Sequence, residues 1–175
     1  MPPWSTALST LPKGALIWSR AGISNILGRP AVNGEEQGFV QALAGGATEE
    51  DVISVILGSP EYFRHAPLLP MMGGGPSTDQ TYIKALYFQL LNRPASDSEV
   101  NAWSSAIASL GRGRVAQMIL TSAEHRSIVV DGYYTSLLHR DRAAPVEVAG
   151  WVNSGLDLDR IRLTFESTLE FYVNG

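Results

Sequence analysis

Apolar residues recur at three-and-four spacing along most of the chain, which is the period of an amphipathic helix. The clearest case runs from Asp79 to Leu91, and its apolar face consists of Ile83, Leu86, Tyr87, Leu90 and Leu91. This spacing predicts a helix over that stretch. Pro94 follows closely and ends the helix, because the residue before a proline is pushed out of the helical region by steric clash.

The end of this helix carries a short pattern that occurs three times. An aromatic residue or Ile is followed by two residues, two aliphatics, one residue and Arg, in Ile23–Arg29, Tyr87–Arg93 and Tyr134–Arg140. After each Arg come a Glu and then a large aromatic residue: Glu35 and Phe39, Glu99 and Trp103, and Glu147 and Trp151. Such self-similarity is typical of repeat proteins, in which each copy is one supersecondary unit.

Helix-start and helix-stop signals follow in the same order. In the middle copy, Ser96 and Glu99 form a capping-box signature, and Gly111 and Gly113 end the helix that this signature opens. The helices predicted next are a third over residues 114–121 and a fourth from Ser122 into Tyr133.

The outer copies carry similar signals. In the first copy, Asn33 and Glu36 form a capping-box signature, and Gly45 and Gly46 end the helix that follows. The next helix of that copy starts at Thr48 with Asp51. In the third copy, the corresponding start is Asp157. In every copy a Ser or Thr stands two residues before a Glu, in Ser59-Pro60-Glu61, Ser122-Ala123-Glu124 and Thr168-Leu169-Glu170. This order predicts an N-cap followed by a charge that suits the helix dipole.

These signals predict an all-α protein built from repeated units of about four short helices each. The units are expected to stack into one compact bundle or two small lobes. The predicted divisions are an N-terminal segment at 1–20, unit one at 21–65, a Pro/Gly-rich linker at 66–78, unit two at 79–130 and a shortened unit three at 131–175. No convincing period-two strand pattern is present.

The composition excludes several classes of partner and of chemical site. The 175 residues have a formal net charge of −4 and no basic patch, so nucleic acid is an unexpected partner. The absence of cysteine excludes disulfides, thiolate metal sites and a Cys nucleophile. Met1 to Trp4 lack the basic region of a signal peptide, and no segment is apolar for long enough to span a bilayer, so neither element is expected in this chain.

The order Tyr-x-x-Leu-Leu-x-Arg-Pro, then Trp, then Ser-x-Glu, which begins at Tyr87, resembles a bacterial repeat family called domain of unknown function 4214. Ile23 and Phe39 replace the Tyr and Trp in the first copy, and Asn92 and His139 replace the Gly that usually precedes the Arg. More distantly, the order is similar to the rod-linker domain of cyanobacterial phycobilisomes. Both resemblances imply helical modules for assembly or adhesion without catalytic residues, and the first implies a secreted, cell-surface or S-layer location.

The repeated Arg29, Arg93 and Arg140 are the most informative polar positions. Each guanidinium follows an apolar helix, and the Glu six or seven residues later is a natural partner for a bidentate pair. They are either ligand clamps or internal staples. We favour staples, because a feature present in every repeat usually serves what every repeat shares.

The aromatic positions Phe39, Trp103 and Trp151 are either core anchors or a platform for stacking sugars. Core anchors are the better prediction, because large aromatics at helical spacing usually bury their rings. Trp4 and Trp18 lie outside the repeat and are the candidate contact residues.

No catalytic, metal or cofactor site is predicted. His65, His125 and His139 form no metal-binding motif, and the offsets of the first two suggest surface positions on helices. The acidic stretches at 49–51 and 157–159 lack the alternating ligands of a calcium loop and are interpreted as helix starts. Neither a nucleophile elbow nor a phosphate-binding loop is present.

The sequence therefore predicts a non-catalytic assembly or adhesion module of a larger bacterial surface or secreted protein or complex. The partners expected are other protein subunits or further domains of the same parent chain. Two alternatives remain open. One is a carbohydrate-binding module that uses exposed aromatics and Arg, and the other is a linker-like scaffold subunit inside a multi-subunit assembly.

Overall fold

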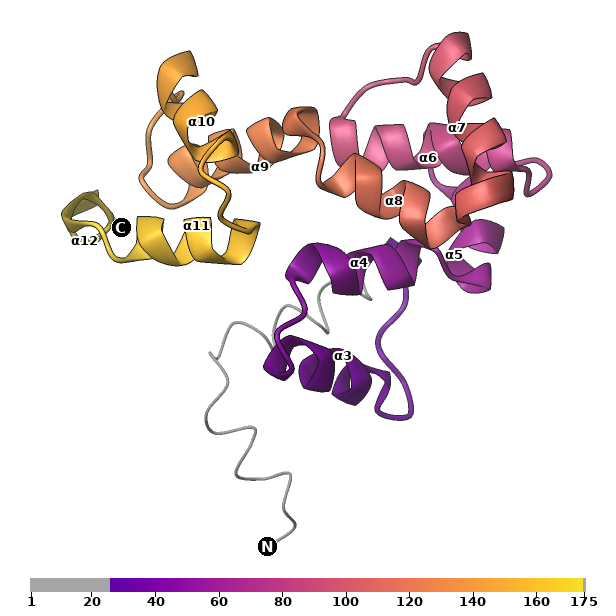
Figure 1. Cartoon of the computed structure of the whole chain (residues 1–175), viewed down its shortest axis with the longest axis horizontal. Helices are drawn as coiled ribbons and strands as arrows, with labels where there is room; N and C mark the ends of the chain where they lie inside the picture. Colours follow the sequence, from indigo (N-terminus) through magenta and orange to yellow (C-terminus); the bar gives the residue numbers. More distant parts are fainter. Residues whose placement is uncertain (1–25, 175) are drawn as a thin grey trace, which may run out of the picture.

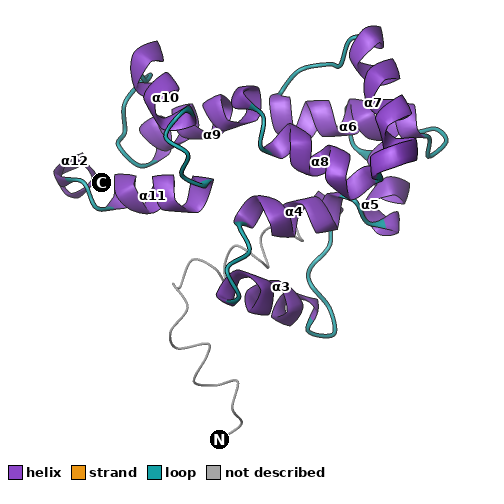
Figure 2. Ribbon diagram, in the orientation of Figure 1, coloured by secondary structure: helices purple, strands orange, loops and turns teal. Residues whose placement is uncertain are grey.

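The computed structural model describes residues 26–174, and the regular secondary structure of this part of the chain is entirely helical (Figures 1 and 2). The all-α prediction is therefore confirmed. The helices are α3 (Glu35–Ala44), α4 (Glu49–Leu57), α5 (Pro60–His65), α6 (Asp79–Leu91), α7 (Asp97–Leu110), α8 (Arg112–Leu120), α9 (Ala123–Ser136), α10 (Pro145–Val152), α11 (Leu158–Glu166) and α12 (Leu169–Asn174), with a 3₁₀ turn η1 (Ala66–Leu68).

Most of the predicted caps are present. Thr48 with Asp51 and Ser96 with Glu99 form complete capping boxes at the starts of α4 and α7. In each box the hydroxyl accepts a backbone N–H and the carboxylate accepts the amide of the N-cap residue, which satisfies two otherwise unpaired donors. The side chains at four further predicted starts also accept a backbone N–H: Ser59, Ser122, Asp157 and Thr168.

The predicted capping box of Asn33 with Glu36 is wrong. The N-cap of α3 is Gly34, which has a left-handed backbone with φ of 76° and no side chain to accept a hydrogen bond. An N-cap side chain reaches the first-turn amides from an extended backbone, and Asn33 has a φ of 54° instead. Glu35 accepts the amide of Val32 at 3.0 Å in its place.

The prediction that Gly113 helps to end α7 is also wrong, because this residue lies inside α8. Gly111, with φ of 78°, separates the two helices alone. Gly113 is instead the point where α8 approaches the end of α4 most closely. A Cβ atom on Gly58 would lie 2.5 Å from the Cα of Gly113, so the contact requires glycine.

The larger core lies between α5, α6, α7 and α8, with the end of α4. The Tyr62 and Tyr82 rings meet edge to face at 5.8 Å, and both are fully buried. Their hydroxyls donate to Gln89 Oε1 at 2.6 Å and to the carbonyl of Arg112 at 3.0 Å, so neither buried hydroxyl is left without a partner. Residues before and after the Pro/Gly-rich segment 66–78 therefore share one core.

The second core is built by α9, α10 and α11 around the ring of Phe165. Its centroid lies 4.8 Å from that of Tyr134 and 5.2 Å from that of Trp151. Helix α9 extends from the α6–α8 group to the α10–α12 group (Figure 1). The predicted boundary between units two and three, at residues 130 and 131, falls within this helix.

Candidate functional site: a repeated arginine–carboxylate cluster

Arg93 lies between two carboxylates in the segment that joins α6 to α7. Its Nε and Nη2 atoms donate to Glu124 at 2.5 and 2.9 Å, and its Nη1 and Nη2 atoms donate to Glu99 at 3.1 and 2.8 Å. Nη1 also donates to the carbonyl of Pro94 at 3.3 Å. A guanidinium has five N–H donors, so these five bonds occupy all of them.

Arg29 repeats this arrangement. It donates to Glu35 at 2.8 and 2.9 Å and to Glu61 at 2.5 and 2.7 Å. Its fifth bond goes to the carbonyl of Pro30 at 3.0 Å. The same donors therefore meet the same kinds of acceptor in units one and two.

Arg140 holds the third copy of the cluster. Its Nη1 donates to Glu147 at 3.1 Å, and its Nε and Nη2 both donate to Glu170. The structure thus places each repeated arginine against the Glu that follows it six or seven residues later. We call these the Arg29, Arg93 and Arg140 clusters, each named for its arginine.

The second carboxylate of each cluster was missed by the sequence analysis, which assigned it only to a helix start. These residues are Glu61, Glu124 and Glu170. Each follows its arginine after 32, 31 and 30 positions respectively. That nearly constant spacing was the available signal, but a contact between residues so far apart in sequence is fixed only by the fold.

The residue before each arginine takes a left-handed backbone. The φ angles are 67° at Gly28, 53° at Asn92 and 53° at His139. Asn and His are among the non-glycine residues that adopt this region most readily. The tight turn that aims each arginine is therefore present without glycine in units two and three.

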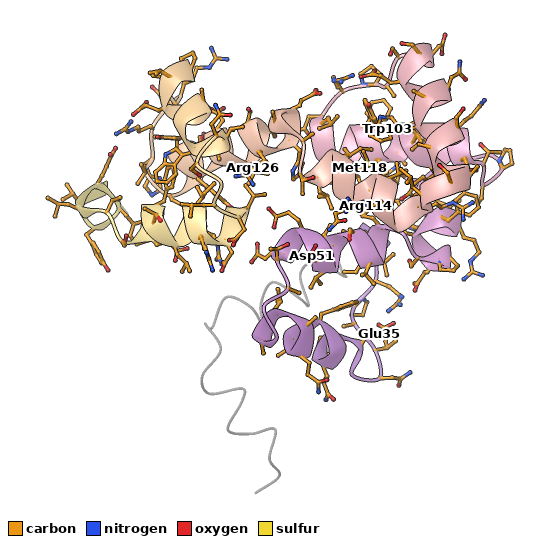
Figure 3. The ribbon with its side chains drawn as sticks, in the orientation of Figure 1. Glu35, Asp51, Trp103, Arg114, Met118 and Arg126 are labelled. Carbon is orange, nitrogen blue, oxygen red and sulfur yellow. The ribbon has the colours of Figure 1, made fainter. Side chains whose placement is uncertain are left out.

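A pair of aromatic rings supports two of the clusters. The Trp103 indole donates to the Tyr87 hydroxyl at 2.8 Å, and the Trp151 indole donates to the Tyr134 hydroxyl at 3.1 Å. Trp103 lies on the side of α7 that faces α6 (Figure 3). The guanidinium carbon of Arg93 lies 4.9 Å from the centre of the Tyr87 ring, within the range of a cation–π contact.

Arg140 lies over the Tyr134 ring in the same way, at 5.3 Å. In unit one, Phe39 occupies the position of the tryptophans and packs half-buried against Val52 and Ile56 of α4. Trp4, Trp18 and Ile23 lie outside the described residues. The polar tips of Trp103 and Trp151 are thus engaged within their own units.

The Arg29 and Arg93 clusters each lower the pKa of the carboxylate that follows the arginine in sequence. Hydrogen bonds from Arg93 and then from the Ser96 amide lower the pKa of Glu99 to about 2. Bonds from Arg29 and then Val32 lower the pKa of Glu35 to about 2 as well. Glu35 and Glu99 therefore stay ionised at all but strongly acidic pH.

The saturation of the guanidiniums limits what these clusters can do chemically. A ligand carboxylate or sugar hydroxyl needs a free N–H donor, and Arg29 and Arg93 have each committed all five donors to protein oxygens. The arrangement suits an internal fastening between a helix end, a helix start and the last helix of the unit.

The Arg93 cluster lies in a segment that resembles a known family. This segment contains α6, α7, α8 and the first turns of α9. Residues 73–129 match the family model described as a domain of unknown function (DUF4214). This agrees with the family resemblance inferred from the sequence order at Tyr87. No curated protein and no solved structure matches the chain. The resemblance to the phycobilisome linker domain stays a prediction.

The DUF4214 segment also contains a histidine that the sequence analysis placed wrongly. His125 is buried, and its Nδ1 lies 2.8 Å from the carbonyl of Leu120. Burial lowers the pKa of this imidazole, which favours its neutral form. The spacing from the Ser122 cap suggested an exposed position, but the His125 ring turns back onto the carbonyl at the end of α8.

Among the described residues, no group of three or more His, Asp and Glu side chains is arranged to hold a metal ion. In the same part of the chain, no helix is long and apolar enough to cross a membrane. The acidic residues at 49–51 do start α4, as predicted. Two of them, Glu49 and Glu50, are however buried, which the sequence did not indicate.

Proposed function

We propose that the chain is a non-catalytic helical module for assembly or adhesion within a larger bacterial surface or secreted protein or complex. The observation that carries this proposal is that each repeated arginine binds two carboxylates of its own unit, and that Arg29 and Arg93 have all five donors engaged within the unit. The repeated polar residues stabilise the units, and binding is left to the surfaces where the units differ. The extracellular or cell-surface location is part of the proposal and comes from the family resemblance.

An exposed apolar surface on α12 supports a protein partner. We call the side chains of Leu169, Tyr172 and Val173 the α12 patch; they are 79%, 74% and 71% exposed. The residues at the position of Tyr172 in the earlier units are partly covered: the guanidinium carbon of Arg112 lies 3.6 Å from the centre of the Phe63 ring, and Arg126 donates to the carbonyl of Leu156. Apolar side chains gathered in this way mark interaction surfaces.

A photo-crosslinking experiment in the cells that naturally express the chain tests this proposal. A photoreactive phenylalanine analogue replaces Tyr172 in one variant and Ala108, an exposed residue of α7, in a matched control. We expect a discrete protein adduct from position 172 and none from position 108. Equal labelling, or none from either position, would contradict a role of the α12 patch in assembly.

Two further results would overturn the proposal as a whole. A hydrolytic activity that is lost on changing one His or Asp of a monomeric chain would make the protein an enzyme. Binding to a glycan array, with Trp103 and Trp151 both strongly quenched by acrylamide, would favour the carbohydrate-binding alternative. Against the latter, both indole N–H groups already have a tyrosine partner.

A further inference from the structure

Two buried carboxylates lie where α4 meets α9 and α11. Glu49 and Glu50 occupy the first turn of α4, and they are only 7% and 3% exposed. Charged residues are rarely buried to this extent unless they are paired. Since they come from unit one and their neighbours come from units two and three, the pair is part of a contact between units.

The neighbours are two arginines and one backbone amide. Arg126 of α9 lies 3.8 Å from Glu50 Oε1, and Arg162 of α11 lies 3.6 Å from Glu49 Oε1. The amide of Leu158, at the start of α11, donates to Glu50 Oε1 at 3.3 Å. We call these five residues the acidic junction.

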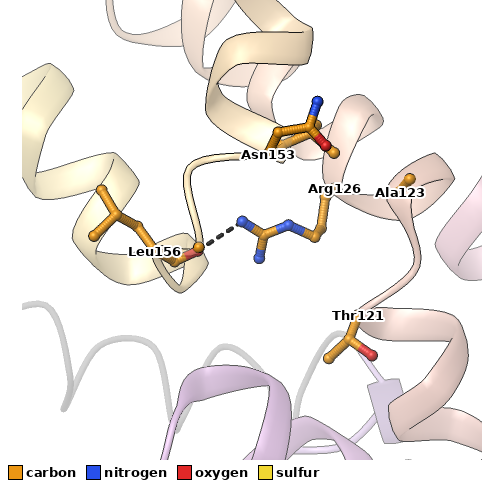
Figure 4. A pocket seen from close by; sticks show the side chains of 7 residues that line it. Thr121, Ala123, Arg126, Asn153 and Leu156 are labelled. Atoms are coloured by element: carbon orange, nitrogen blue, oxygen red, sulfur yellow. Dashed lines mark hydrogen bonds between the residues drawn. The ribbon is translucent and has the colours of Figure 1, made fainter.

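Arg126 extends this contact to the segment before α11. Its Nη2 donates to the carbonyl of Leu156 at 2.6 Å, beside an open hollow of about 320 Å³ (Figure 4). Arg126 therefore joins α9, the start of α11 and the acidic turn of α4. Asp51, the next residue of α4, faces α8 instead and accepts from Gln117 at 2.5 Å (Figure 3).

The two carboxylates of the acidic junction are incompletely paired, whereas Arg162 forms its direct ion pair with Asp159 of α11. Both arginine–carboxylate distances are too long for a direct hydrogen bond. Glu50 Oε2 and Arg162 Nε are buried without a hydrogen-bond partner. Glu49 is buried beside an arginine that does not form a direct hydrogen bond with it, and such burial of a charge is costly, so the protonated form of Glu49 is favoured.

We propose that the acidic junction is a pH-sensitive clasp, which holds unit three against α4 while Glu49 is protonated and loosens when Glu49 ionises.

The surrounding charges agree with this direction. Burial is the main cause that raises the pKa of Glu49, to about 7 from an ordinary 4.5, and Arg162 opposes the shift. Asp159, Glu50 and Asp157 repel a further negative charge and strengthen it. The other charged or titratable groups on the elements around α4 are Arg160 and Glu166 on α11; Glu124, His125, Asp131, Tyr133 and Tyr134 on α9; Arg112 and Arg114 on α8; Glu35 and Glu36 on α3; and Glu61, Tyr62, Arg64 and His65 on α5.

The sign of the pH effect follows from linkage. We call the form in which unit three is held against α4 closed, and the form in which this contact is loosened open. A carboxyl group with a higher pKa in the closed form binds its proton more tightly there than in the open form. The closed form therefore loses stability relative to the open form as the pH rises from 4.5 to about 7, and it changes little above that value. The clasp is closed at pH 5 and loosened at pH 8.

The lack of native cysteine allows a direct test by spin labelling. Gln41→Cys on α3 and Thr164→Cys on α11 place labels at exposed positions on either side of the junction. Dipolar distance measurements are expected to give one distribution at pH 5 and an added, longer one at pH 8. Identical distributions at the two pH values would overturn the proposal.

Two variants make the test specific. With Glu49→Gln, the single distribution should persist at both pH values, because this side chain has no proton to lose. Asp97→Asn, which removes an exposed carboxylate on α7, should leave the pH response unchanged. A response that survives Glu49→Gln would exclude Glu49 as its cause.

A measurement on the chain with its native glutamates does not depend on how the variants fold. The ¹³C shift of the Glu49 carboxyl carbon, followed from pH 4 to pH 9, should change with a midpoint near 7. A midpoint near the ordinary value of 4.5 would overturn the proposal.

Discussion

Units two and three contain the same arginine cluster but differ in how much core surrounds it. In unit two, α6 and α7 contribute buried residues along their length, and α7 buries Val100 and Ile107. In unit three, the corresponding α10 has no buried residue and ends soon after Trp151. Arg93 and Arg140 nevertheless hold their two carboxylates and lie over their tyrosines in the same way.

This difference shows that core burial and the arginine cluster contribute separately to the structure of a unit. Core burial varies from unit to unit, whereas the charged cluster and its tyrosine are repeated with nearly the same geometry. We infer that the cluster fixes how three chain segments meet and that the core supplies most of the stability. Variants that remove either the core contacts or the cluster contacts of one unit test this inference.

The largest effect is expected from the core of unit two. Leu86 is fully buried in α6, so Leu86→Ala should lower the free energy of unfolding by about 2 to 5 kcal/mol through lost burial and a residual cavity. Denaturant unfolding measures this change. Leu163→Ala on the exposed face of α11 is the control and should shift the free energy by less than about 0.5 kcal/mol. Equal effects would contradict the core assignment.

The next effect concerns how unit two is joined to its neighbours. Gly58→Ala places a methyl group against the backbone of Gly113, so α4 and α8 must separate, at a cost of about 1 to 3 kcal/mol. Gly132→Ala, in the interior of α9 with no atom close to the new methyl group, should instead stabilise by about 0.4 to 1 kcal/mol. A shift of the same sign in both variants would show that the close approach of α4 and α8 is unimportant.

A matched pair of valines compares the two units directly. Val100 is buried on α7, and Val148 holds the equivalent, less buried position on α10. Val100→Ala should cost about 2 kcal/mol and Val148→Ala about 1 kcal/mol, since the loss scales with the apolar surface removed from the core. Thermal and chemical unfolding can rank them, and the reverse order would mean that unit three has the firmer core.

Removal of the cluster arginine should have a smaller effect than removal of a core residue. Arg93→Ala should cost about 1 kcal/mol, because more than a third of its side chain is exposed and the ion pairs are screened by water. The cost should fall at high salt. A double-mutant cycle with Glu124→Gln isolates the pair, and a coupling free energy of zero would remove the cluster as a fastening.

The smallest predicted effect is an acid dependence of the same cluster. Glu99 has a pKa of about 2 in the folded chain against 4.5 ordinarily, so its contribution to stability is present above pH 4.5 and is lost as the pH falls toward 2. Denaturant midpoints at pH 5, 3 and 2 measure this loss. Glu99→Gln should show a smaller decrease over that interval, and an unchanged decrease would assign the acid sensitivity to other groups.

Local signals in the sequence predicted much of the fold. Helix α6 has the predicted bounds, and the caps at Thr48 and Ser96 were evident because each depends on residues three positions apart. The failures at Asn33 and Gly113 have a different origin. A left-handed backbone at one and a close helix contact at the other are set by tertiary packing.

The same distinction applies to the candidate site. The nearer carboxylate of each arginine was predictable from a spacing of six or seven residues, whereas Glu124 reaches Arg93 across 31 positions. The burial of Glu49 and Glu50 was also hidden, because their neighbours lie in units two and three. Acidic residues at a helix start look alike in sequence whether water or another helix covers them.

The continuity of α9 gives the two connections in this chain different mechanical properties. An α-helix turns by about 100° and rises about 1.5 Å per residue, so one residue added within α9 would rotate everything after it by that angle. Leu158 would then no longer face Glu50. A residue added among the glycines at 73–75 could be absorbed locally, since their side-chain positions are open. The rotation of unit three relative to unit two about the α9 axis thus depends on the exact number of residues in that helix. The loop between units one and two can change in length without such a rotation.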